Sequence, residues 1–372
     1  MKITIVLNTS WNLYNFRLGL IDALLGEGYQ VTLIAPEDEY SDRLRDLGYD
    51  LVTVAMDRRG INPLRDLKFF FQLYRVYRSI RPEFTLHFTV KPNIYGTLAA
   101  SLLRIKAINT VSGLGTVFLK KGAVSQVAQL LYRVTFRLPQ KVFFHNPDDY
   151  QLFIDRGLIA SQRAAVVPGS GVNIHRFSPD ETAPPEVFTF LVIARLLYDK
   201  GIVEYAEAAR SLRAQGVAAR FQLLGARDPQ HQRGIPDEVI DRWIQYGTID
   251  YLGTTDDVRP YIQQADTVVL PSYREGLPRT LLEAASLEKP IVATDTPGCR
   301  HIVADGQNGR LCRVRDAVDL ASKMQQLMNL SPQQRQVMGQ KGREIVTERF
   351  SEEQVINRYL HAVGQPTTFA PS

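Results

Sequence analysis

The segment from Pro271 to Gly298 carries residues whose types and spacing could bind a charged ligand rich in hydroxyl groups. Glu275 and Glu283 lie eight positions apart in EGLPRTLLE, directly after the apolar run TVVLPS. This pattern predicts a buried strand, a tight turn at 276–278 and a helix that begins near Arg279. The free amides and positive dipole end of such a helix favour an anion such as a diphosphate.

Within this unit each residue type has a chemical use. Gly276 would let the backbone come close to a ligand. Glu283, one to two turns into the helix, could accept hydrogen bonds from ribose hydroxyls, and Glu275 on the strand-end loop would face a sugar. A purely structural role also remains open, because Glu in a first helical turn commonly stabilises the helix dipole.

The elements around this unit predict an α/β protein with two Rossmann-like domains. Apolar strand patterns such as KITIVLNTS, QVTLIAP and FTLHFTV alternate with helical patterns, and the alternation restarts at FTFLVIAR. Strands that alternate with helices favour parallel sheets, whose ligands bind at the carboxyl ends of the strands. The polar run SPDETAPPE predicts a linker, which gives an N-terminal domain over 1–180, a C-terminal domain over 187–350 and a last helix over 351–372 that packs on the first domain.

Composition restricts the class of protein further. The chain of 372 residues has an apolar fraction of 45% and only two cysteines, Cys299 and Cys312, which fits a globular protein of a reducing cytoplasm. No stretch reaches the length of a spanning helix, and no Cys/His cluster has the spacing of a zinc site.

The charge is unevenly distributed along the chain. From Arg58 to Lys141 there are 15 Lys or Arg against two acidic residues, whereas the remainder has 29 basic and 37 acidic residues. The segments 68–78 and 118–141 interleave cations, aromatics and aliphatics at helical spacing. They are typical either of a surface that rests on anionic lipid or of ordinary amphipathic helices with solvated basic faces.

Taken together, these motifs resemble retaining glycosyltransferase family 4, also called glycosyltransferase group 1. The resemblance is specific at EGLPRTLLE and at ARLLYDKG, and it covers nearly the whole chain. It implies a GT-B fold, in which two Rossmann-like domains with parallel sheets face each other across a cleft. In the first half, SWNLYNFR, HFTVKPNIYG and TVSGLGTVF look like bacterial transferases that extend undecaprenyl-diphosphate-linked sugars, including N-acetylgalactosaminyl and capsular-polysaccharide transferases.

The resemblance also implies which residues bind the donor, a nucleotide sugar that we expect to be a UDP-sugar. Arg195 and Lys200 would hold its diphosphate, and with Glu275 they are the expected catalytic residues. The segments LLGARD and DYLG resemble those that cradle the base and ribose. The expected donor-binding residues are Arg195, Lys200, Gly225, Leu252, Glu275, Gly276, Leu277, Thr280 and Glu283.

The acceptor is expected in the first domain, as a polyprenyl-diphosphate-linked saccharide at an anionic membrane surface on the inner face of the cytoplasmic membrane. The expected acceptor-binding residues are Asn15, Arg17, Lys91, Asn93, Gly113 and Gly115. Many family members carry a catalytic His in one loop of the first domain. The corresponding loop here reads VSGLG and contains no His, so no catalytic His is assigned. His87, inside an apolar strand, is interpreted as a core residue.

The resemblance implies transfer with retention of configuration. Retaining hydrolases pair two carboxylates, and no convincing second carboxylate is found here. Front-face substitution is therefore favoured, with no metal or other cofactor and no nucleic-acid partner. A nucleotide-sugar epimerase or phosphorylase of the same fold, a transferase for a soluble acceptor and a non-enzymatic binding protein remain as alternatives.

Overall fold

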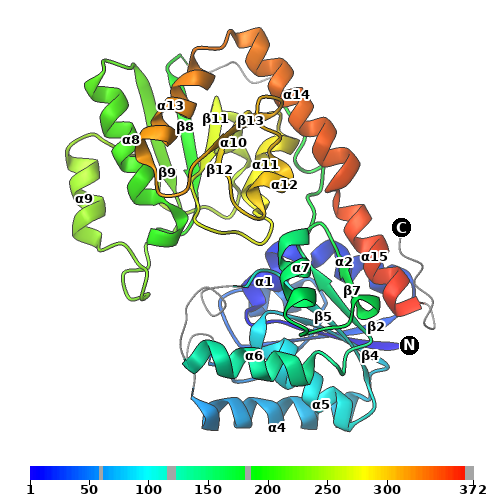
Figure 1. Cartoon of the computed structure of the whole chain (residues 1–372). Coiled ribbons are helices and arrows are strands. Elements are labelled where there is room, and N and C mark those ends of the chain that lie inside the picture. The colour runs from blue at the N-terminus through cyan, green and yellow to red at the C-terminus, as the bar shows by residue number, and fades with distance from the viewer. Residues whose placement is uncertain (58–61, 115–122, 181–185, 365–372) are drawn as a thin grey trace. The chain divides into compact units, whose positions relative to one another are not determined.

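The computed structural model describes residues 1–57, 62–114, 123–180 and 186–364. These residues form two compact units. The first contains Met1–Ser170 together with the chain from Glu353, and the second contains Gly171–Glu352. Each unit is built around its own parallel sheet (Figure 1).

The first unit has a seven-stranded sheet in the order β3-β2-β1-β4-β5-β6-β7, and all its strand pairs are parallel. Its strands are β1 (Lys2–Val6), β2 (Gln30–Ala35), β3 (Asp50–Thr53), β4 (Phe84–Phe88), β5 (Lys106–Val111), β6 (Lys141–Phe144) and β7 (Ala164–Val166). Its helices are α1 (Ser10–Phe16), α2 (Leu18–Gly26), α3 (Ser41–Asp46), α4 (Pro63–Ile80), the π-helical turn η1 (Pro92–Gly96), α5 (Thr97–Leu102), α6 (Ala123–Thr135), α7 (Pro147–Asp155), the 3-10 turn η2 (Ser161–Arg163) and α15 (Glu352–Gly364).

Helices cover both faces of this sheet. The apolar sides of α4 and α5 pack on one face through residues such as Phe69 and Leu73, and α2 and α15 pack on the other. Strands covered on both faces need continuous apolar runs, and β4 is buried at every position. Two buried residues of β4, Thr85 and His87, are polar, and His87 is discussed below with its partners.

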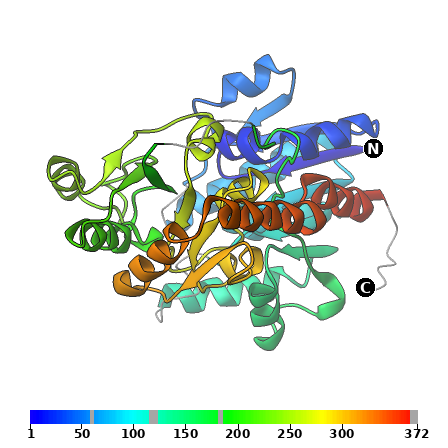
Figure 2. The ribbon, with the colours of Figure 1, turned by 90° about the horizontal axis from the view of Figure 1, so that it is seen from above.

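The C-terminal helix α15 belongs to the first unit. Its Val355 and Tyr359 lie in the same core cluster as β1 and β4, and the Tyr359 hydroxyl is 2.8 Å from Oγ1 of Thr110 on β5. In Figure 2 this helix, in red, lies beside the blue and cyan elements of that unit. The chain therefore returns to the first unit at its end.

The second unit has a six-stranded parallel sheet in the order β10-β9-β8-β11-β12-β13. Its strands are β8 (Phe188–Ile193), β9 (Ala219–Leu224), β10 (Asp250–Tyr251), β11 (Thr267–Leu270), β12 (Ile291–Thr294) and β13 (Gly309–Cys312). Its helices are the 3-10 turn η3 (Tyr198–Lys200), α8 (Ile202–Ala214), α9 (Asp237–Gln245), α10 (Arg259–Gln263), α11 (Arg279–Ser286), α12 (Cys299–Ile302), α13 (Ala317–Met328) and α14 (Pro332–Arg349).

The boundary between the units differs from the predicted linker at 178–186. The second unit begins at Gly171, because Val172 and Phe177 are buried in the core cluster around β11 and α11. The backbone of Val172 also pairs with residues 350 to 352, at the end of α14. The residues before the predicted linker thus already pack in the second unit.

Both sheets reverse their strand order next to their first strand, between β1 and β4 and between β8 and β11. Loops that leave such a switch point at the carboxyl ends of the strands diverge and leave room for a ligand. Among the described residues, no helix is both long and apolar enough to cross a membrane.

Candidate functional site

Two predicted donor residues meet at the switch point of the second sheet. Lys200 follows β8 and Glu275 follows β11, and the Lys200 Nζ lies 2.5 Å from Oε1 of Glu275. Their side chains are 25% and 13% exposed. A partly buried ion pair is stronger than a surface pair because water screens it less. Residues 75 positions apart therefore form one charged centre at the carboxyl edge of the sheet, the edge at which open parallel sheets generally bind ligands.

Two glycines bring the backbone of this edge close together. Gly201, between η3 and α8, has a φ of +70°, and a Cβ there would lie 2.0 Å from the Pro271 carbonyl oxygen. A Cβ on Gly225, after β9, would lie 1.9 Å from the carbonyl oxygen of Ala194. Because only glycine fits these contacts, the loops after β8, β9 and β11 are held close to one another.

The helix α11 begins at Arg279, as predicted. Its N-cap is Pro278, which makes no side-chain cap hydrogen bond. Glu283 is 9% exposed, and its Oε1 accepts a hydrogen bond from Arg279 Nε at 2.8 Å. Burial raises the pKa of Glu283, and the charge of Arg279 opposes that rise only in part. Arg279 was not among the predicted site residues, although its spacing of four from Glu283 on a helix is visible in the sequence.

The remaining predicted donor residues follow strands β8, β10 and β11 of the same sheet or lie on α11. Arg195 is exposed, and its side chain makes no hydrogen bond or ion pair with the part of the chain described. Thr280 Oγ1 lies 3.4 Å from the Ile193 carbonyl oxygen at the end of β8. Leu252 and Leu277 are half-buried against the core of the second unit. Gly276 lies against Gly298, where a Cβ would meet the Gly276 carbonyl oxygen at 2.7 Å.

In the first unit, two of the predicted acceptor residues are cations with defined partners, Lys91 with Asp66 and Arg17 with the Phe88 ring. The Lys91 Nζ lies 2.5 Å from Oδ1 of Asp66 on α4, and both side chains are largely buried. Arg17 is 4% exposed, with its guanidinium 4.2 Å from the centre of the Phe88 ring. The partner of Lys91 was missed from the sequence because nothing in the pattern joins positions 25 apart.

The other acceptor predictions lie close by in the fold. Asn93 is buried, and its Nδ2 donates to the Thr110 carbonyl oxygen at 2.9 Å. Asn15 donates to the Trp11 carbonyl oxygen at 2.9 Å. Gly113 has a φ of 152°. Gly115 lies outside the described residues.

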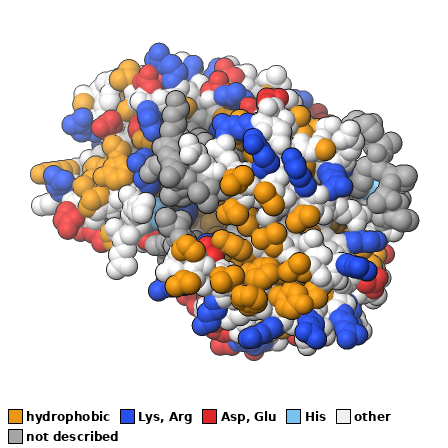
Figure 3. Space-filling view, turned by 60° about the horizontal axis from the view of Figure 1, so that its bottom comes forward, with side chains coloured by type: hydrophobic (Ala, Val, Ile, Leu, Met, Phe, Trp, Pro, Cys, Tyr) orange, Lys and Arg blue, Asp and Glu red, His pale blue; other side chains and the backbone are white. Residues whose placement is uncertain are grey.

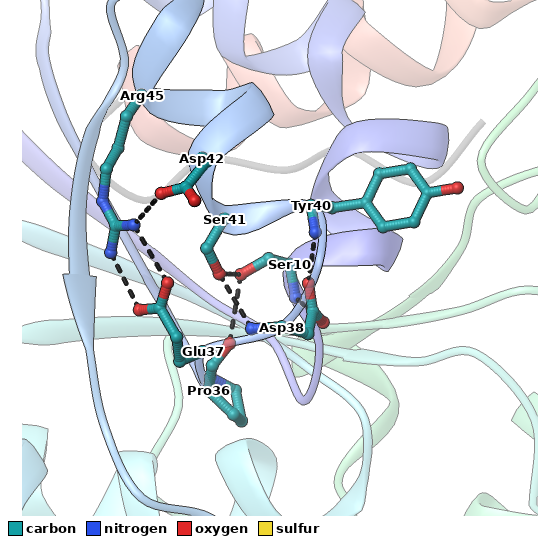
Figure 4. A network of polar contacts seen from close by, with 8 residues as sticks. All are labelled: Ser10, Pro36, Glu37, Asp38, Tyr40, Ser41, Asp42 and Arg45. Carbon is teal, nitrogen blue, oxygen red and sulfur yellow. Dashed lines mark hydrogen bonds and ion pairs between the residues drawn. The ribbon is translucent and has the colours of Figure 1, made fainter.

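A polar network fixes the start of α1, the helix that leads to Asn15 and Arg17 (Figure 4). Asp38 accepts hydrogen bonds from the Ser10 amide at 2.9 Å and from the Tyr40 amide at 3.0 Å. The Ser10 hydroxyl also bonds to the Pro36 carbonyl oxygen and to the Ser41 hydroxyl. The loops after β1 and β2 are therefore tied together at the carboxyl edge of the first sheet.

Two histidines are buried in the first unit. His87 lies between the Tyr77 hydroxyl at 2.8 Å and Asn109 Oδ1 at 2.9 Å, and burial lowers its pKa to about 4. It is a satisfied core residue, as the sequence indicated. His145, directly after β6, was missed, and its Nε2 has no hydrogen-bond partner among the described residues. Burial, with a contribution from Arg17, lowers its pKa to about 3.

Comparison with known proteins shows to which family the chain belongs. The profile of the family described as "Glycosyl transferases group 1" matches residues 173–345, and that of "Glycosyl transferase 4-like" matches residues 2–146. The N,N'-diacetylbacillosaminyl-diphospho-undecaprenol alpha-1,3-N-acetylgalactosaminyltransferase of Campylobacter jejuni is 31% identical over 345 residues, 88% of this chain and 89% of the relative. The chain belongs to the group 1 glycosyltransferases.

Other relatives of this glycosyltransferase agree with the assignment. The UDP-Gal:alpha-D-GlcNAc-diphosphoundecaprenol alpha-1,3-galactosyltransferase of Escherichia coli is 22% identical over 79% of each chain. Among solved structures, sucrose-phosphate synthase from Thermosynechococcus elongatus matches with a TM-score of 0.83 at 18% identity over 98% of both chains. Anabaena HepE in complex with UDP-glucose matches with a TM-score of 0.81 at 17% identity over 98% of this chain and 99% of that chain. The predicted GT-B fold and glycosyltransferase activity are confirmed.

Proposed function

We propose that this glycosyltransferase moves an N-acetylhexosamine or hexose from a UDP-sugar to a polyprenyl-diphosphate-linked saccharide during assembly of a cell-surface polysaccharide. The observation that carries the proposal is the Lys200–Glu275 pair at the switch point of the second sheet, beside the start of α11. The names of the relatives from Campylobacter jejuni and Escherichia coli support the lipid-linked acceptor, and the second also supports a UDP-sugar donor.

The charges at this site suit departure of a diphosphate. Arg195 and Lys200 would neutralise the negative charge that grows on the leaving group, and the α11 amides would add partial positive charge. A bound diphosphate would compete with Glu275 for Lys200. Glu275 would then be free to accept hydrogen bonds from hydroxyls of the transferred sugar and to oppose its developing positive charge.

The reaction proceeds with retention by front-face substitution. The bond between the anomeric carbon and the diphosphate oxygen breaks, and the acceptor oxygen forms its bond to the same face of that carbon. The proton of the acceptor hydroxyl passes to the departing diphosphate. Lys200 and Arg195 would supply the cationic charge, so the proposal includes no metal and no cofactor besides the nucleotide sugar.

We place the acceptor at the carboxyl edge of the first sheet, near Arg17, Lys91 and Asn93. The Lys91–Asp66 pair gives this edge a cation that an acceptor diphosphate could recruit. The lipid tail of such an acceptor would hold the enzyme at an anionic membrane surface, on the inner face of the cytoplasmic membrane. The excess of cations between Arg58 and Lys141 supports this location.

The test is release of nucleoside diphosphate from a panel of UDP- and GDP-sugars, with and without a short-chain polyprenyl-diphosphate sugar. Wild type is compared with Glu275→Gln and with Glu238→Gln, an exposed Glu in the first turn of α9. We expect acceptor-dependent release from one UDP-sugar, a loss of at least about 100-fold in Glu275→Gln, and no change in Glu238→Gln.

Each other outcome has a definite meaning. Release that needs no acceptor would replace the proposal with a nucleotide-sugar epimerase or hydrolase. Release only with a soluble saccharide would show that the acceptor carries no lipid. Full activity in Glu275→Gln would show that the Glu275 carboxylate has no role in the reaction.

A further inference from the structure

The first unit exposes large apolar side chains on α4, α5 and α6. Leu64, Leu67 and Phe71 on α4 are 78%, 50% and 50% exposed, and their spacing of three and four places them on one side of the helix. Others are Leu102 on α5, Leu130 and Val134 on α6, and Leu138. Figure 3 shows hydrophobic side chains gathered on this face and bordered by Lys and Arg. A contiguous apolar patch with a charged border is typical of an interaction surface.

A basic hollow lies where α4 ends. It has a volume of about 540 Å³ and is lined by the end of α4, the turn between α4 and β4, and the turn between α5 and β5. Arg78, Arg81, Arg104 and Lys106 line it, against the single carboxylate of Glu83. None of these four cations forms an ion pair within the described residues. The hollow therefore presents uncompensated positive charge.

The backbone at two of these cations is unusual for its residue type. Three other helices of the first unit, α2, α3 and α7, are followed by a glycine with positive φ: Gly28, Gly48 and Gly157. The corresponding turns after α4 and α5 instead carry Arg81 at a φ of 52° and Arg104 at 57°. A left-handed conformation costs a residue with a Cβ more than it costs glycine. The fold thus keeps arginines at two turns where glycine would be easier to accommodate.

The hollow is continuous with the apolar face. Arg75 and Arg78 continue the exposed line of α4 that begins at Leu64, Leu67 and Phe71, at spacings of four and three, and Arg78 lines the hollow. An apolar surface that ends in a pocket of arginines matches a phospholipid, whose chains are apolar and whose headgroup carries a phosphate.

We infer that this hollow binds the headgroup phosphate of an anionic phospholipid while the apolar face of α4 and α6 enters the bilayer interface. The inference rests on the proposed lipid-linked function, and it names the surface by which the enzyme reaches the membrane. Arg81 and Arg104 are the residues that select anionic from neutral lipid.

The test is co-sedimentation of the full chain with vesicles of phosphatidylcholine alone or mixed with phosphatidylglycerol. The double variant Arg81→Gly/Arg104→Gly removes both cations and places at each position the residue that best tolerates positive φ, so it keeps the fold. The matched control is Arg156→Ala/Arg210→Ala, which removes two exposed arginines elsewhere. We expect wild type and control to bind the anionic vesicles, and the Gly variant to bind on the order of 20-fold more weakly.

Equal binding of wild type to neutral and anionic vesicles would overturn the inference, and so would equal loss in control and Gly variant. Inorganic phosphate is then titrated into the anionic sample. Displacement of wild type at millimolar phosphate, with sulfate at equal ionic strength inactive, would assign the hollow to free phosphate and overturn the lipid assignment.

Turnover with a short-chain, water-soluble acceptor is measured on the same variants. Its retention in the Gly variant separates docking from catalysis, and its absence in wild type would refute the proposed function without deciding vesicle binding.

Discussion

At the scale of single residues, the proposed donor site depends on the Lys200–Glu275 pair. Removing Lys200 would leave the largely buried Glu275 carboxylate without its cation and would take one positive charge from the proposed diphosphate site. We predict that Lys200→Gln weakens UDP binding about tenfold or more, measured by titration calorimetry.

The chain offers a matched control for this change. Lys341 and Glu344 also lie 2.5 Å apart, but both side chains are exposed on α14. Lys341→Gln should leave UDP affinity unchanged, because an exposed pair contributes little and lies on a different element. An equal effect of the two substitutions would show that Lys200 acts through general charge and not at the diphosphate.

Glu283 leads to a second prediction at this scale. Its pKa is raised, because burial disfavours the charged carboxylate more than Arg279 stabilises it. For an acid, a raised folded pKa means that ionisation at neutral pH lowers the stability of the fold. We predict that Glu283→Gln raises the thermal unfolding midpoint and reduces the further rise caused by UDP, both measured in one fluorimetric scan. Glu238→Gln should change neither value, and a lower midpoint for Glu283→Gln would show that the carboxylate stabilises the fold.

The sequence predicted residue types better than it predicted partners. Glu275 and Glu283 could be identified because a strand, a turn and a helix follow one another along the chain. The pairing of Lys91 with Asp66 could not be predicted, because only the packing of α4 against η1 brings the two residues together. His145 was missed since a single His after an apolar run has no distinctive spacing.

At the scale of elements, the turn at Gly201 positions Lys200 at the start of α8. Both ends of α8 carry a glycine with positive φ, Gly201 at +70° and Gly216 at +80°. Only Gly201 is also crowded, by the Pro271 carbonyl oxygen, whereas a Cβ on Gly216 would meet nothing within 4 Å. The two positions therefore separate the conformational cost of a Cβ from its steric cost.

We predict that Gly216→Ala lowers the free energy of unfolding by about 1 kcal/mol, and that Gly201→Ala lowers it by about 3 kcal/mol. The measurement is urea unfolding of a Trp11→Phe background, in which Trp243 in the second unit is the remaining tryptophan. Equal losses would mean that the loop after β11 moves away at little cost. That loop would then not hold Lys200 in place.

The sequence predicted element boundaries well where local signals set them, and it predicted them poorly where tertiary packing sets them. The last helix, predicted over 351–372, is α15 over Glu352–Gly364, and residues 365–372 lie outside the described part of the chain. The predicted helical segment 118–141 contains Pro139, and α6 ends at Thr135. The linker was placed too late because polar composition marks exposed chain, while the unit boundary depends on where Val172 and Phe177 pack.

At the scale of the whole molecule, the two units differ in how acid should affect them. The first unit holds the two buried histidines, His87 and His145, whose pKa values are about 4 and about 3. His175, His231 and His301 of the second unit are exposed or half-buried. Both buried imidazoles are neutral in the fold and face neutral or cationic neighbours, Tyr77 for His87 and Arg17 for His145.

A histidine with a lowered folded pKa contributes its full stability above its unfolded pKa, near 6.5, and loses it as the pH falls. Below that pH the unfolded chain binds a proton that the folded chain does not. We predict that the first unit loses about 1 kcal/mol per pH unit for each histidine between about pH 6.5 and 4, and that the second unit changes less. The measurement is thermal unfolding followed by Trp11 in a Trp243→Phe background and by Trp243 in a Trp11→Phe background.

The decisive variant is His145→Gln, which keeps a polar side chain but removes the titrating group. The acid slope of the first unit should then fall by about half, because His87 would remain as the buried histidine that gains a proton only on unfolding. His361→Gln, on the exposed side of α15, is the matched control and should leave the slope unchanged. If His145→Gln kept the full slope, the acid sensitivity of this unit would have to come from groups other than the His145 imidazole.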